Sequence, residues 1–245
     1  MAEGSLDSVV QEGLLVDRKW LRDKGFDRPA VDYYLRSGKL EAVTHGIYRK
    51  PGPPLKWQNV VYSLSVLGYR LHVGHKTALR FHGFQHYLAF NGNSRLFLYC
   101  REGLPKWVNA LDIGYEFLDM PRDPFNTSET GLEEVPFSTW DWPIPYSSPE
   151  RAFLELTSTL TLAEEIQNAE LMLEGAANLR PGLVQRLLEE CRQVKAKRLF
   201  LWLAREQNHA WYAHIDQSRI DLGKGKRQIV EGGILDKEYL ITVLN

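Results

Sequence analysis

The chain of 245 residues is too short for three full-sized domains, and its length predicts one large domain or two smaller ones. A content of 44% hydrophobic and 25% charged residues is typical of a globular protein and excludes a disordered, fibrous or coiled-coil chain. The formal net charge of −1 argues against a protein that is coated everywhere for nucleic acid. It does not exclude one local basic face.

The cysteine count and the N-terminal sequence bear on localisation. Cys100 and Cys191 cannot by themselves build a disulfide scaffold or a zinc site, and they indicate a reducing compartment. The N-terminus lacks the basic start and apolar stretch of a signal peptide. No segment approaches 18 uninterrupted apolar residues. We therefore expect a soluble, cytoplasmic protein with no membrane partner.

The first fifty residues predict several short elements that end sharply. Leu6, Val9 and Val10 form a short apolar helical stripe. Asp17 is placed to cap a helix over 18–24 that ends at Gly25. Asp27, followed by Arg-Pro, predicts the start of a third helix, which ends at residues 37–38.

Two short runs, 40–43 and 47–49, surround the turn 44–46 and predict a small β-hairpin. Three prolines between residues 51 and 54 then mark a domain boundary. Helix, helix–turn–helix and hairpin in this order predict a winged helix-turn-helix domain over 1–52, whose third helix enters the DNA major groove. The fold class is therefore α+β, with a mixed α/β C-terminal domain over 53–245.

The rest of the chain mixes predicted helices and strands. Apolar runs at 96–99 and 113–118 predict buried strands, whereas residues 121–148 are rich in proline and predict loops. Thr161-x-x-Glu164 has the form of a capping box. Further helices are expected around residues 60–67 and 77–81, from Ser148-Pro149 onward, and over 181–191 and 195–206. Short strands are expected over 219–243.

Basic residues are concentrated in the predicted head. Residues 17–50 hold nine Lys/Arg against five Asp/Glu, a net charge of +4, whereas the chain from residue 51 onward carries −2. A few phosphate contacts are enough to give useful affinity for DNA. The alternative is an ordinary solvated helix face. Arg28 and Arg36 are the candidates for base edges, because arginine can bind guanine bidentately, and Tyr33 lies beside them. The phosphate or wing candidates are Arg18, Lys19, Lys39, Arg49 and Lys50.

Two basic segments lie near the C-terminus. Lys197 and Arg198 belong to a basic stretch over 180–205, which is either a partner surface or a core helix with basic ends. The string Asp221-Leu-Gly-Lys-Gly-Lys-Arg227 combines glycines with Lys224, Lys226 and Arg227. It is either an anion or partner contact or a basic β-turn.

Motifs for catalysis are missing. The sequence has no nucleophile elbow, no phosphate-cradling loop and no Asp-x-Asp, and no Glu-x-Lys or Asp-x-Lys follows residue 51. His72, His75, His82 and His86 lie within fifteen residues, and the last two could share a helical face as zinc ligands do. Because no H-E-x-x-H frame accompanies them, hydrogen-bonded structural histidines are the favoured interpretation. We expect no catalytic residue, no metal and no cofactor.

The residues resemble a known family over nearly the whole chain. Gly13-Leu-Leu, Trp20-Leu21, Gly25-Phe26, Tyr34-Leu35, Gly38-Lys-Leu40 and Gly46-Ile-Tyr48 resemble the winged-helix domain of AbiEi-type antitoxins. Val73-Gly-His-Lys-Thr77 is similar to their next block. The most specific matches lie in Lys197-Arg-Leu-Phe200, the string 221–227, Gly232-Gly233 and Tyr239-Leu-Ile-Thr-Val243.

The resemblance implies a non-enzymatic bacterial antitoxin of a type IV toxin–antitoxin system. Such an antitoxin counteracts an AbiEii-type nucleotidyltransferase toxin, with which no stable complex is expected. It also represses its own operon by binding inverted repeats in the operator DNA. We assign antitoxicity to the C-terminal domain, with Lys197, Arg198, Lys224, Lys226 and Arg227 as contact candidates. Asp27 and Asp32 depart from a purely basic recognition helix. The alternatives are a winged-helix regulator whose C-terminal domain senses a small ligand, and a DNA-processing enzyme.

Overall fold

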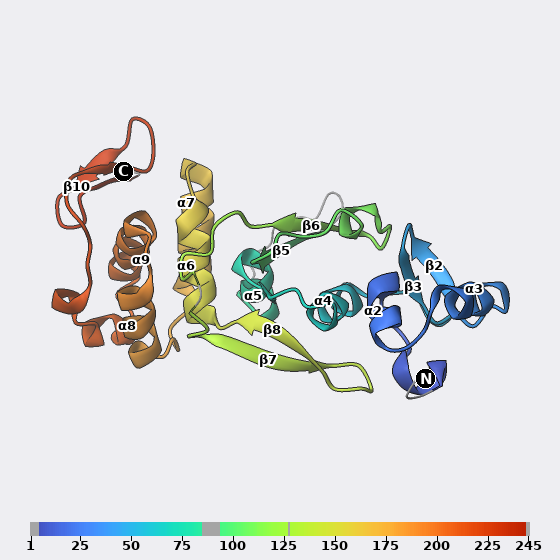
Figure 1. The fold of residues 1–245 in the computed structure, drawn as a ribbon. Helices are drawn as coiled ribbons and strands as arrows, with labels where there is room; N and C mark the ends of the chain where they lie inside the picture. Colours follow the sequence, from blue (N-terminus) through green and yellow to red (C-terminus); the bar gives the residue numbers. More distant parts are fainter. Residues whose placement is uncertain (1–4, 85–93, 127, 244–245) are drawn as a thin grey trace. The chain divides into compact units, whose positions relative to one another are not determined.

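The computed structural model describes residues 5–84, 94–126 and 128–243 (Figure 1). The chain divides into two compact units. We call Met1–His72, Gly92–Asp119 and Glu134–Ile144 the N-terminal unit, and Val73–Asn91, Met120–Glu133 and Pro145–Asn245 the C-terminal unit. The predicted α+β class, with a mixed C-terminal part, is confirmed. Among the described residues, no helix is long and apolar enough to cross a membrane.

The first fifty residues fold in the predicted order. Three helices, α1 (Leu6–Val9), α2 (Arg18–Asp23) and α3 (Arg28–Arg36), precede the hairpin of β2 (Glu41–Thr44) and β3 (Ile47–Arg49). The Asp17 carboxylate accepts a hydrogen bond from the Trp20 amide at 2.7 Å and caps α2 as predicted. Gly25 then ends the turn after α2 with a φ of +88°, a conformation that suits glycine. Helix–turn–helix and hairpin therefore agree with the winged-helix prediction.

The hairpin belongs to a small antiparallel sheet that the sequence did not reveal in full. A third strand, β1 (Val16–Asp17), pairs with β3, so the strand order is β1-β3-β2. Thr44 pairs with Ile47 across His45-Gly46, and Gly46 has a φ of +79°. A two-residue turn of this kind needs positive φ, and glycine supplies it. The predicted strand 40–43 is thus shifted by one residue.

Apolar side chains from distant parts of the chain form the core of the head. Leu21, Val31 and Leu40 are almost fully buried in it. Trp142 belongs to the same cluster, although it lies far along the chain. Its indole stacks on Tyr62 with ring centroids 4.4 Å apart, and its Nε1 donates to the Gln11 side chain at 2.8 Å. The N-terminal unit therefore includes segments well beyond residue 52. The boundary after residue 52 stays a prediction.

A five-stranded sheet forms in the middle of the chain, in the order β6-β5-β4-β8-β7. The predicted strands are β5 (Ser94–Cys100) and β6 (Tyr115–Asp119), which pair in parallel. The prediction of loops throughout 121–148 is wrong, because β7 (Leu132–Phe137) and β8 (Trp142–Ser147) lie there. β7 contains Pro136 and is an edge strand, where a missing amide donor is tolerated. The remaining elements of this part are α4 (Trp57–Val66), β4 (Leu71–Val73) and the short 3₁₀ helix η1 (Val108–Ala110).

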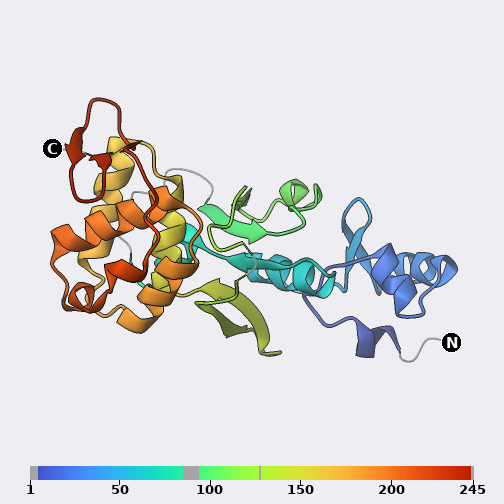
Figure 2. The same ribbon diagram turned by 60° about the vertical axis from the view of Figure 1, so that its left-hand side comes forward.

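In the described part of the C-terminal unit the α-helices are α5 (His75–Phe81), α6 (Pro149–Thr159), α7 (Ala163–Glu174), α8 (Pro181–Glu190) and α9 (Val194–Gln207). α6 packs against α5, α8 and α9, as Figures 1 and 2 show for α9. The Ser148 hydroxyl accepts from the Arg151 amide, and Pro149 occupies the first turn, as predicted. The predicted capping box is wrong, since the Glu165 carboxylate, rather than Glu164, accepts from the amides before α7.

A buried ionic network joins α6 to the segment before β7. The Arg151 side chain is fully covered, and its Nε and Nη2 donate to Glu155 at 2.9 Å and to Asp123 at 2.8 Å. Its Nη1 donates to the carbonyl oxygens of Ser128 and Thr130. Because a buried guanidinium is costly unless its donors are satisfied, this network fixes the loop on the helix.

The end of the chain wraps around α9. Two 3₁₀ helices, η2 (Ala210–His214) and η3 (Gln217–Arg219), lead into three short strands. These are β9 (Arg227–Gln228), β10 (Ile234–Asp236) and β11 (Ile241–Val243), in the order β10-β11-β9. β11 pairs antiparallel with β10 and parallel with β9. The prediction of short strands over 219–243 is therefore confirmed for these segments.

Candidate nucleic-acid interface

α3 presents one apolar face to the core and one polar face outward. Val31 is 2% exposed and anchors the helix, whereas Arg28, Tyr33 and Arg36 are exposed. Arg28 and Arg36 are eight residues apart, which places them about 12 Å apart along a helix axis, or three to four stacked base pairs. The two predicted base-edge candidates thus lie on the accessible side of the predicted recognition helix.

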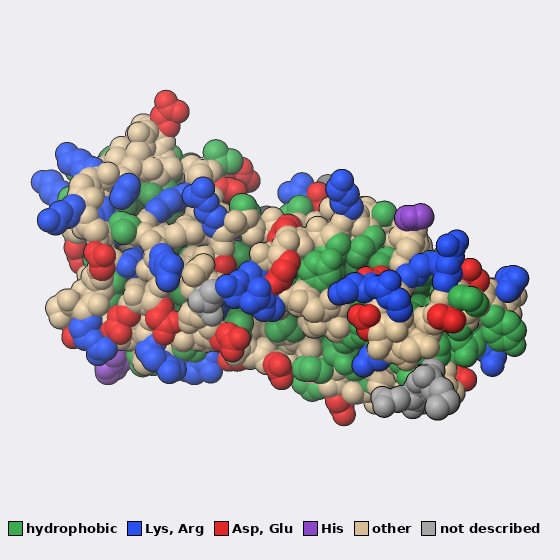
Figure 3. Space-filling view, viewed as in Figure 1, with side chains coloured by type: hydrophobic (Ala, Val, Ile, Leu, Met, Phe, Trp, Pro, Cys, Tyr) green, Lys and Arg blue, Asp and Glu red, His purple; other side chains and the backbone are tan. Residues whose placement is uncertain are grey.

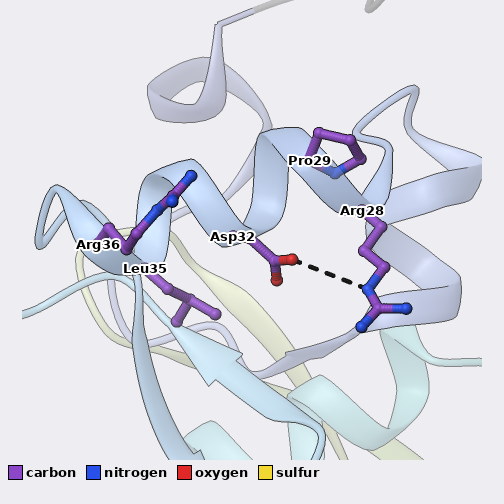
Figure 4. Close-up of a pocket in the computed structure, with 5 residues that line it drawn as sticks. All are labelled: Arg28, Pro29, Asp32, Leu35 and Arg36. Carbon is purple, nitrogen blue, oxygen red and sulfur yellow. Dashed lines mark ion pairs between the residues drawn. The ribbon is translucent and has the colours of Figure 1, made fainter.

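A shallow groove follows this side of α3. It is lined by Arg28, Pro29, Asp32, Leu35 and Arg36 (Figure 4). Figure 4 shows Arg28 and Asp32 pointing toward one another, while Arg36 extends from the other end of the helix. The Arg28 Nε lies 3.8 Å from the Asp32 carboxylate. The groove therefore carries a cation at each end and an anion between them.

Asp32 also holds a second arginine. The Arg18 Nη2 donates to its carboxylate at 3.0 Å, and the Arg18 Nε donates to the Tyr48 hydroxyl at 2.7 Å. The guanidinium lies 5.6 Å from the centre of the Tyr48 ring. Arg18 comes from α2, Asp32 from α3 and Tyr48 from β3, so this cluster joins the three parts of the head. Asp32 and Tyr48 are not predicted from the sequence as partners of Arg18, although the i, i+4 spacing of Arg28 and Asp32 is a signal for the pair on α3.

The other aspartate of α3 has a local role. The Asp27 carboxylate accepts from the Ala30 amide at 2.9 Å and caps the helix. Asp27 and Asp32 are therefore structural partners of the helix end and of the arginines. The helix nevertheless has a basic face, because Arg28 and Arg36 are exposed.

Two of the wing candidates are already engaged inside the head. The Arg49 side chain is 15% exposed, and it donates to Glu41 at 2.6 Å and to the Pro53 carbonyl at 2.9 Å. The Lys50 ammonium lies 2.8 Å from the Asp7 carboxylate, and its charge and hydrogen bond lower the Asp7 pKa. These two residues hold the wing to the body of the head, so a phosphate would have to compete with their present partners.

The remaining candidates of the head have exposed side chains. Lys19 and Lys39 are exposed, and Figure 3 shows Lys and Arg side chains spread over this part of the molecule among acidic ones. The structure thus sorts the eight predicted contacts by accessibility. Those with exposed side chains are Arg18, Lys19, Arg28, Tyr33, Arg36 and Lys39.

The five C-terminal candidates fall into a buried and an exposed group. Lys197 and Arg198 lie inside α9 and are 3% and 2% exposed. Lys224 and Lys226 are exposed on the loop between η3 and β9, and Arg227, the first residue of β9, is exposed as well. Arg198 therefore cannot reach a partner directly, and it can act only through the residues that it holds.

The histidines occupy separate structural positions. His72 is buried and stacks on Tyr99, with ring centroids 5.0 Å apart. The His75 amide donates to Glu155 at 2.8 Å and its Nε2 lies 2.8 Å from the Thr159 hydroxyl, while burial lowers the His75 pKa to about 3. His82 hydrogen-bonds the Ser147 carbonyl. His86 lies outside the described residues.

No group of three or more His, Cys, Asp or Glu side chains that could hold a metal ion occurs among the described residues. Both cysteines are buried, and burial raises the pKa of each thiol to about 11. Thiols with such pKa values are poor nucleophiles at neutral pH, since the thiolate is the reactive form.

Comparisons with known proteins address both the fold and the family. The crystal structure of the RV2827C protein from Mycobacterium tuberculosis is similar, with a TM-score of 0.54 at 14% sequence identity. The match covers 94% of this chain and 86% of that one, and at this identity it shows the fold alone. No curated protein matches the chain in sequence.

Two family models match consecutive parts of the sequence. The first is described as a transcriptional regulator, AbiEi antitoxin N-terminal domain, and matches residues 4–90. The second is described as a transcriptional regulator, AbiEi antitoxin, type IV TA system, and matches residues 93–244. The chain therefore belongs to the AbiEi antitoxin family of transcriptional regulators of type IV toxin–antitoxin systems.

Proposed function

We propose that this protein is a non-enzymatic autorepressor and antitoxin. Its head reads inverted repeats in the operator of its own genes, and its C-terminal unit counteracts a nucleotidyltransferase toxin of the AbiEii type without a stable complex. Membership of the family supports both activities.

The observation that carries operator binding is the outer side of α3. Arg28 and Arg36 are exposed at a separation along α3 that fits base pairs about three to four steps apart in a major groove. Arg18, held against α3 by Asp32 and Tyr48, lies next to them and is half exposed. We assign Arg28 and Arg36 to base edges, and Arg18, Lys19 and Lys39 to phosphates.

Replacement of Arg36 tests the operator assignment. We expect Arg36→Ala to weaken operator binding by about 1–3 kcal/mol, or roughly 5- to 150-fold, and to relax specificity at one position of each repeat. Gel shifts with wild-type and single-base-substituted operators measure both effects. Arg186→Ala, which removes an exposed arginine from α8, is the matched control and should bind as the wild type does. An unchanged affinity for Arg36→Ala would refute the assignment.

A rescue assay tests the antitoxin part. Cells that express the neighbouring toxin gene should grow when this protein is co-expressed, and Arg28→Ala/Arg36→Ala should rescue as well as the wild type, because antitoxicity is assigned to the C-terminal unit. Failure of the wild-type protein to rescue growth would favour a regulator without antitoxin activity.

A further inference from the structure

An anion lies in the middle of the exposed side of α3. Arg28, Asp32 and Arg36 follow one another at intervals of four residues, so each lies about 6 Å further along the helix axis than the one before. All three line the same groove, and Figure 4 shows Asp32 on the helix between the two arginines. The Asp32 side chain is 41% exposed. DNA that enters this groove therefore meets a carboxylate as well as two guanidinium groups.

The stability of the head gives little reason for an acidic side chain at this place. The Arg28 Nε and the Asp32 carboxylate are 3.8 Å apart, and the Arg28 side chain is 83% exposed. Exposed ion pairs of this kind contribute little to stability. The negative charge also opposes the phosphates of DNA and so lowers the affinity for any sequence. Recognition of a base is a role that offsets this loss.

A chain of hydrogen bonds fixes the position of this carboxylate. The Arg18 Nη2 donates to the Asp32 Oδ1 at 3.0 Å, and the Arg18 Nε donates to the Tyr48 hydroxyl at 2.7 Å. Tyr48 is only 5% exposed, so the core of the head holds the far end of the chain. The Asp32 carboxylate is therefore preorganised, which lowers the entropy that is lost when a ligand donates to it.

The second oxygen of this carboxylate keeps its capacity to accept a hydrogen bond. An ionised carboxylate has two oxygens with about four lone-pair sites, and Arg18 uses one of these sites. The Arg28 Nε, at 3.8 Å from Oδ2, lies beyond hydrogen-bond distance. Within residues 5–84, 94–126 and 128–243, no other side chain or amide donates to Asp32. Oδ2 is thus an acceptor that a donor from outside the protein can use.

We propose that Asp32 is a specificity-determining residue, which accepts a hydrogen bond from a base amino group in the major groove. This inference rests on the operator binding proposed above. Cytosine presents its N4 amino group there and adenine its N6 amino group, whereas guanine and thymine present oxygen acceptors. A carboxylate accepts from the first pair of bases and repels the oxygens of the second. Asp32 therefore selects cytosine or adenine on one strand, about two base pairs from the positions that Arg28 and Arg36 read.

Selection from a pool of duplex DNA with a randomised segment, followed by sequencing, gives the base preference of the full-length protein at every position. Arg28→Ala and Arg36→Ala assign the positions that the two arginines read. At one further position between these, the wild type should prefer cytosine or adenine. Asp32→Asn should lower the discrimination against guanine and thymine there by about 5- to 150-fold, because an amide can donate to their oxygens.

Two control variants separate base reading from charge. Asp27→Asn removes the same charge from the start of the same helix, and asparagine caps a helix as well as aspartate does. It should change the affinity for all sequences alike. Asp32→Glu keeps the carboxylate and should keep the preference for an amino group. Equal effects of Asp27→Asn and Asp32→Asn at every position would overturn the proposal.

Changes in the DNA test the same contact with the wild-type protein. Replacing the selected cytosine by a 2-pyrimidinone, or the selected adenine by unsubstituted purine, removes only the amino group from the base. Fluorescence anisotropy should show binding that is weaker by about 5- to 150-fold. Unchanged affinity for these duplexes refutes the contact. An effect of Asp32→Asn that is confined to the positions of Arg28 and Arg36 also refutes it, because Asp32 would then only orient the arginines.

A failure of operator binding itself has a different outcome. The wild-type protein would then enrich no sequence from the randomised pool. A failure of the inference alone would leave an enriched sequence in which the position between those of Arg28 and Arg36 carries all four bases equally.

Discussion

The Nε of Arg18 donates a hydrogen bond to the Tyr48 hydroxyl at 2.7 Å and thereby joins the first residue of α2 to the middle of β3. Tyr48 is only 5% exposed, so its hydroxyl is fixed by the core of the head. Through this contact, the wing fixes the position of Arg18, a half-exposed candidate for DNA binding. The pair provides a direct way to test whether Arg18 works because it is held in place.

Tyr48→Phe removes only this hydroxyl. We expect operator affinity to fall roughly 2- to 12-fold, equivalent to the net 0.5–1.5 kcal/mol of one hydrogen bond, because Arg18 loses its fixed orientation. Fluorescence anisotropy measures the affinity, and urea unfolding shows whether the fold is intact. Tyr34→Phe, which deletes a hydroxyl from α3, is the control and should bind normally. Normal binding by Tyr48→Phe would mean that Arg18 needs no partner.

Asp32→Asn keeps the shape of the side chain and removes the anion between the arginines of α3. Affinity for arbitrary DNA should rise, because a negative charge no longer opposes the phosphates. The ratio of operator to arbitrary-sequence affinity should fall, since Arg18 and Arg28 lose the carboxylate that orients them. Gel shifts on both DNAs give the two numbers. A rise in affinity with an unchanged ratio would make Asp32 a simple repulsive charge.

Arg198→Met should loosen the glycine-rich loop over residues 221–227, because Arg198 donates to the carbonyl oxygens of Leu222, Gly223 and Gly225, and also to that of Leu240. Four carbonyl oxygens lose their donor, and we expect the free energy of unfolding to fall by about 2–4 kcal/mol. Trypsin cleaves after Lys and Arg, so the rate of cleavage within the loop measures how well ordered the loop is. Cleavage after Lys224 should become faster. Arg186→Met is the control, for which surface substitution predicts a change within about 0.5 kcal/mol. Unchanged cleavage would show that the glycine turns alone order the loop.

Arg151→Met removes the centre of the buried network on α6. The carboxylates of Glu155 and Asp123 would lose their cation, and Glu155 is fully covered. We expect a loss of about 3–5 kcal/mol in the free energy of unfolding, measured with urea. Adding Glu155→Gln to Arg151→Met should lower the free energy of unfolding less than Glu155→Gln does in the wild type. In the double variant, the buried Arg151 guanidinium that Glu155→Gln alone would leave without this carboxylate is already absent. Simple additivity would mean that the two side chains do not interact.

The stability of the C-terminal unit should depend on pH through His75. Burial, which outweighs the nearby Glu155 carboxylate, keeps its pKa at about 3, whereas an unfolded histidine has a pKa of about 6.5. The unfolded state therefore binds more protons between these values, and stability falls as the pH drops from about 6.5 toward 3. From about pH 7.5 to about pH 5 the loss should be about 2 kcal/mol.

Urea unfolding over this range tests the effect of His75. His75→Asn is a suitable variant, because His75 has a φ of +55° and asparagine tolerates that conformation. The variant should show a shallower dependence on pH than the wild type. Identical dependence in both proteins would assign the titration to other groups.

The local elements of the head could be predicted because their signals are short-range. Asp17, Asp27 and Gly46 each determine the backbone within three residues, and all three act as expected. Short-range signals also placed the helices that follow Ser148 and Pro181. By contrast, β1 has only two residues and exists through its pairing with β3, which no local pattern shows.

The partners of the candidate residues were less predictable for the same reason. The fold brings Arg18 within hydrogen-bonding distance of Asp32 and Tyr48. It also brings Arg198 to a loop that lies more than twenty residues further along the chain. Composition identified both arginines as basic residues of interest. Only the tertiary structure shows that the first is half exposed beside α3 and that the second is buried and holds a loop.

Trp142 has a consequence for the order in which the protein is made. Its contact with Gln11 spans 131 residues, and its ring belongs to the same core as Leu21 and Val31. During synthesis, the ribosome must therefore extend the chain well past the prolines at 51–54 before this core can close. A nascent or truncated chain that contains α3 but lacks Trp142 has the candidate DNA-binding residues without the complete core that supports them. For the proposed autorepressor, incomplete products should therefore compete poorly with the full-length protein for the operator.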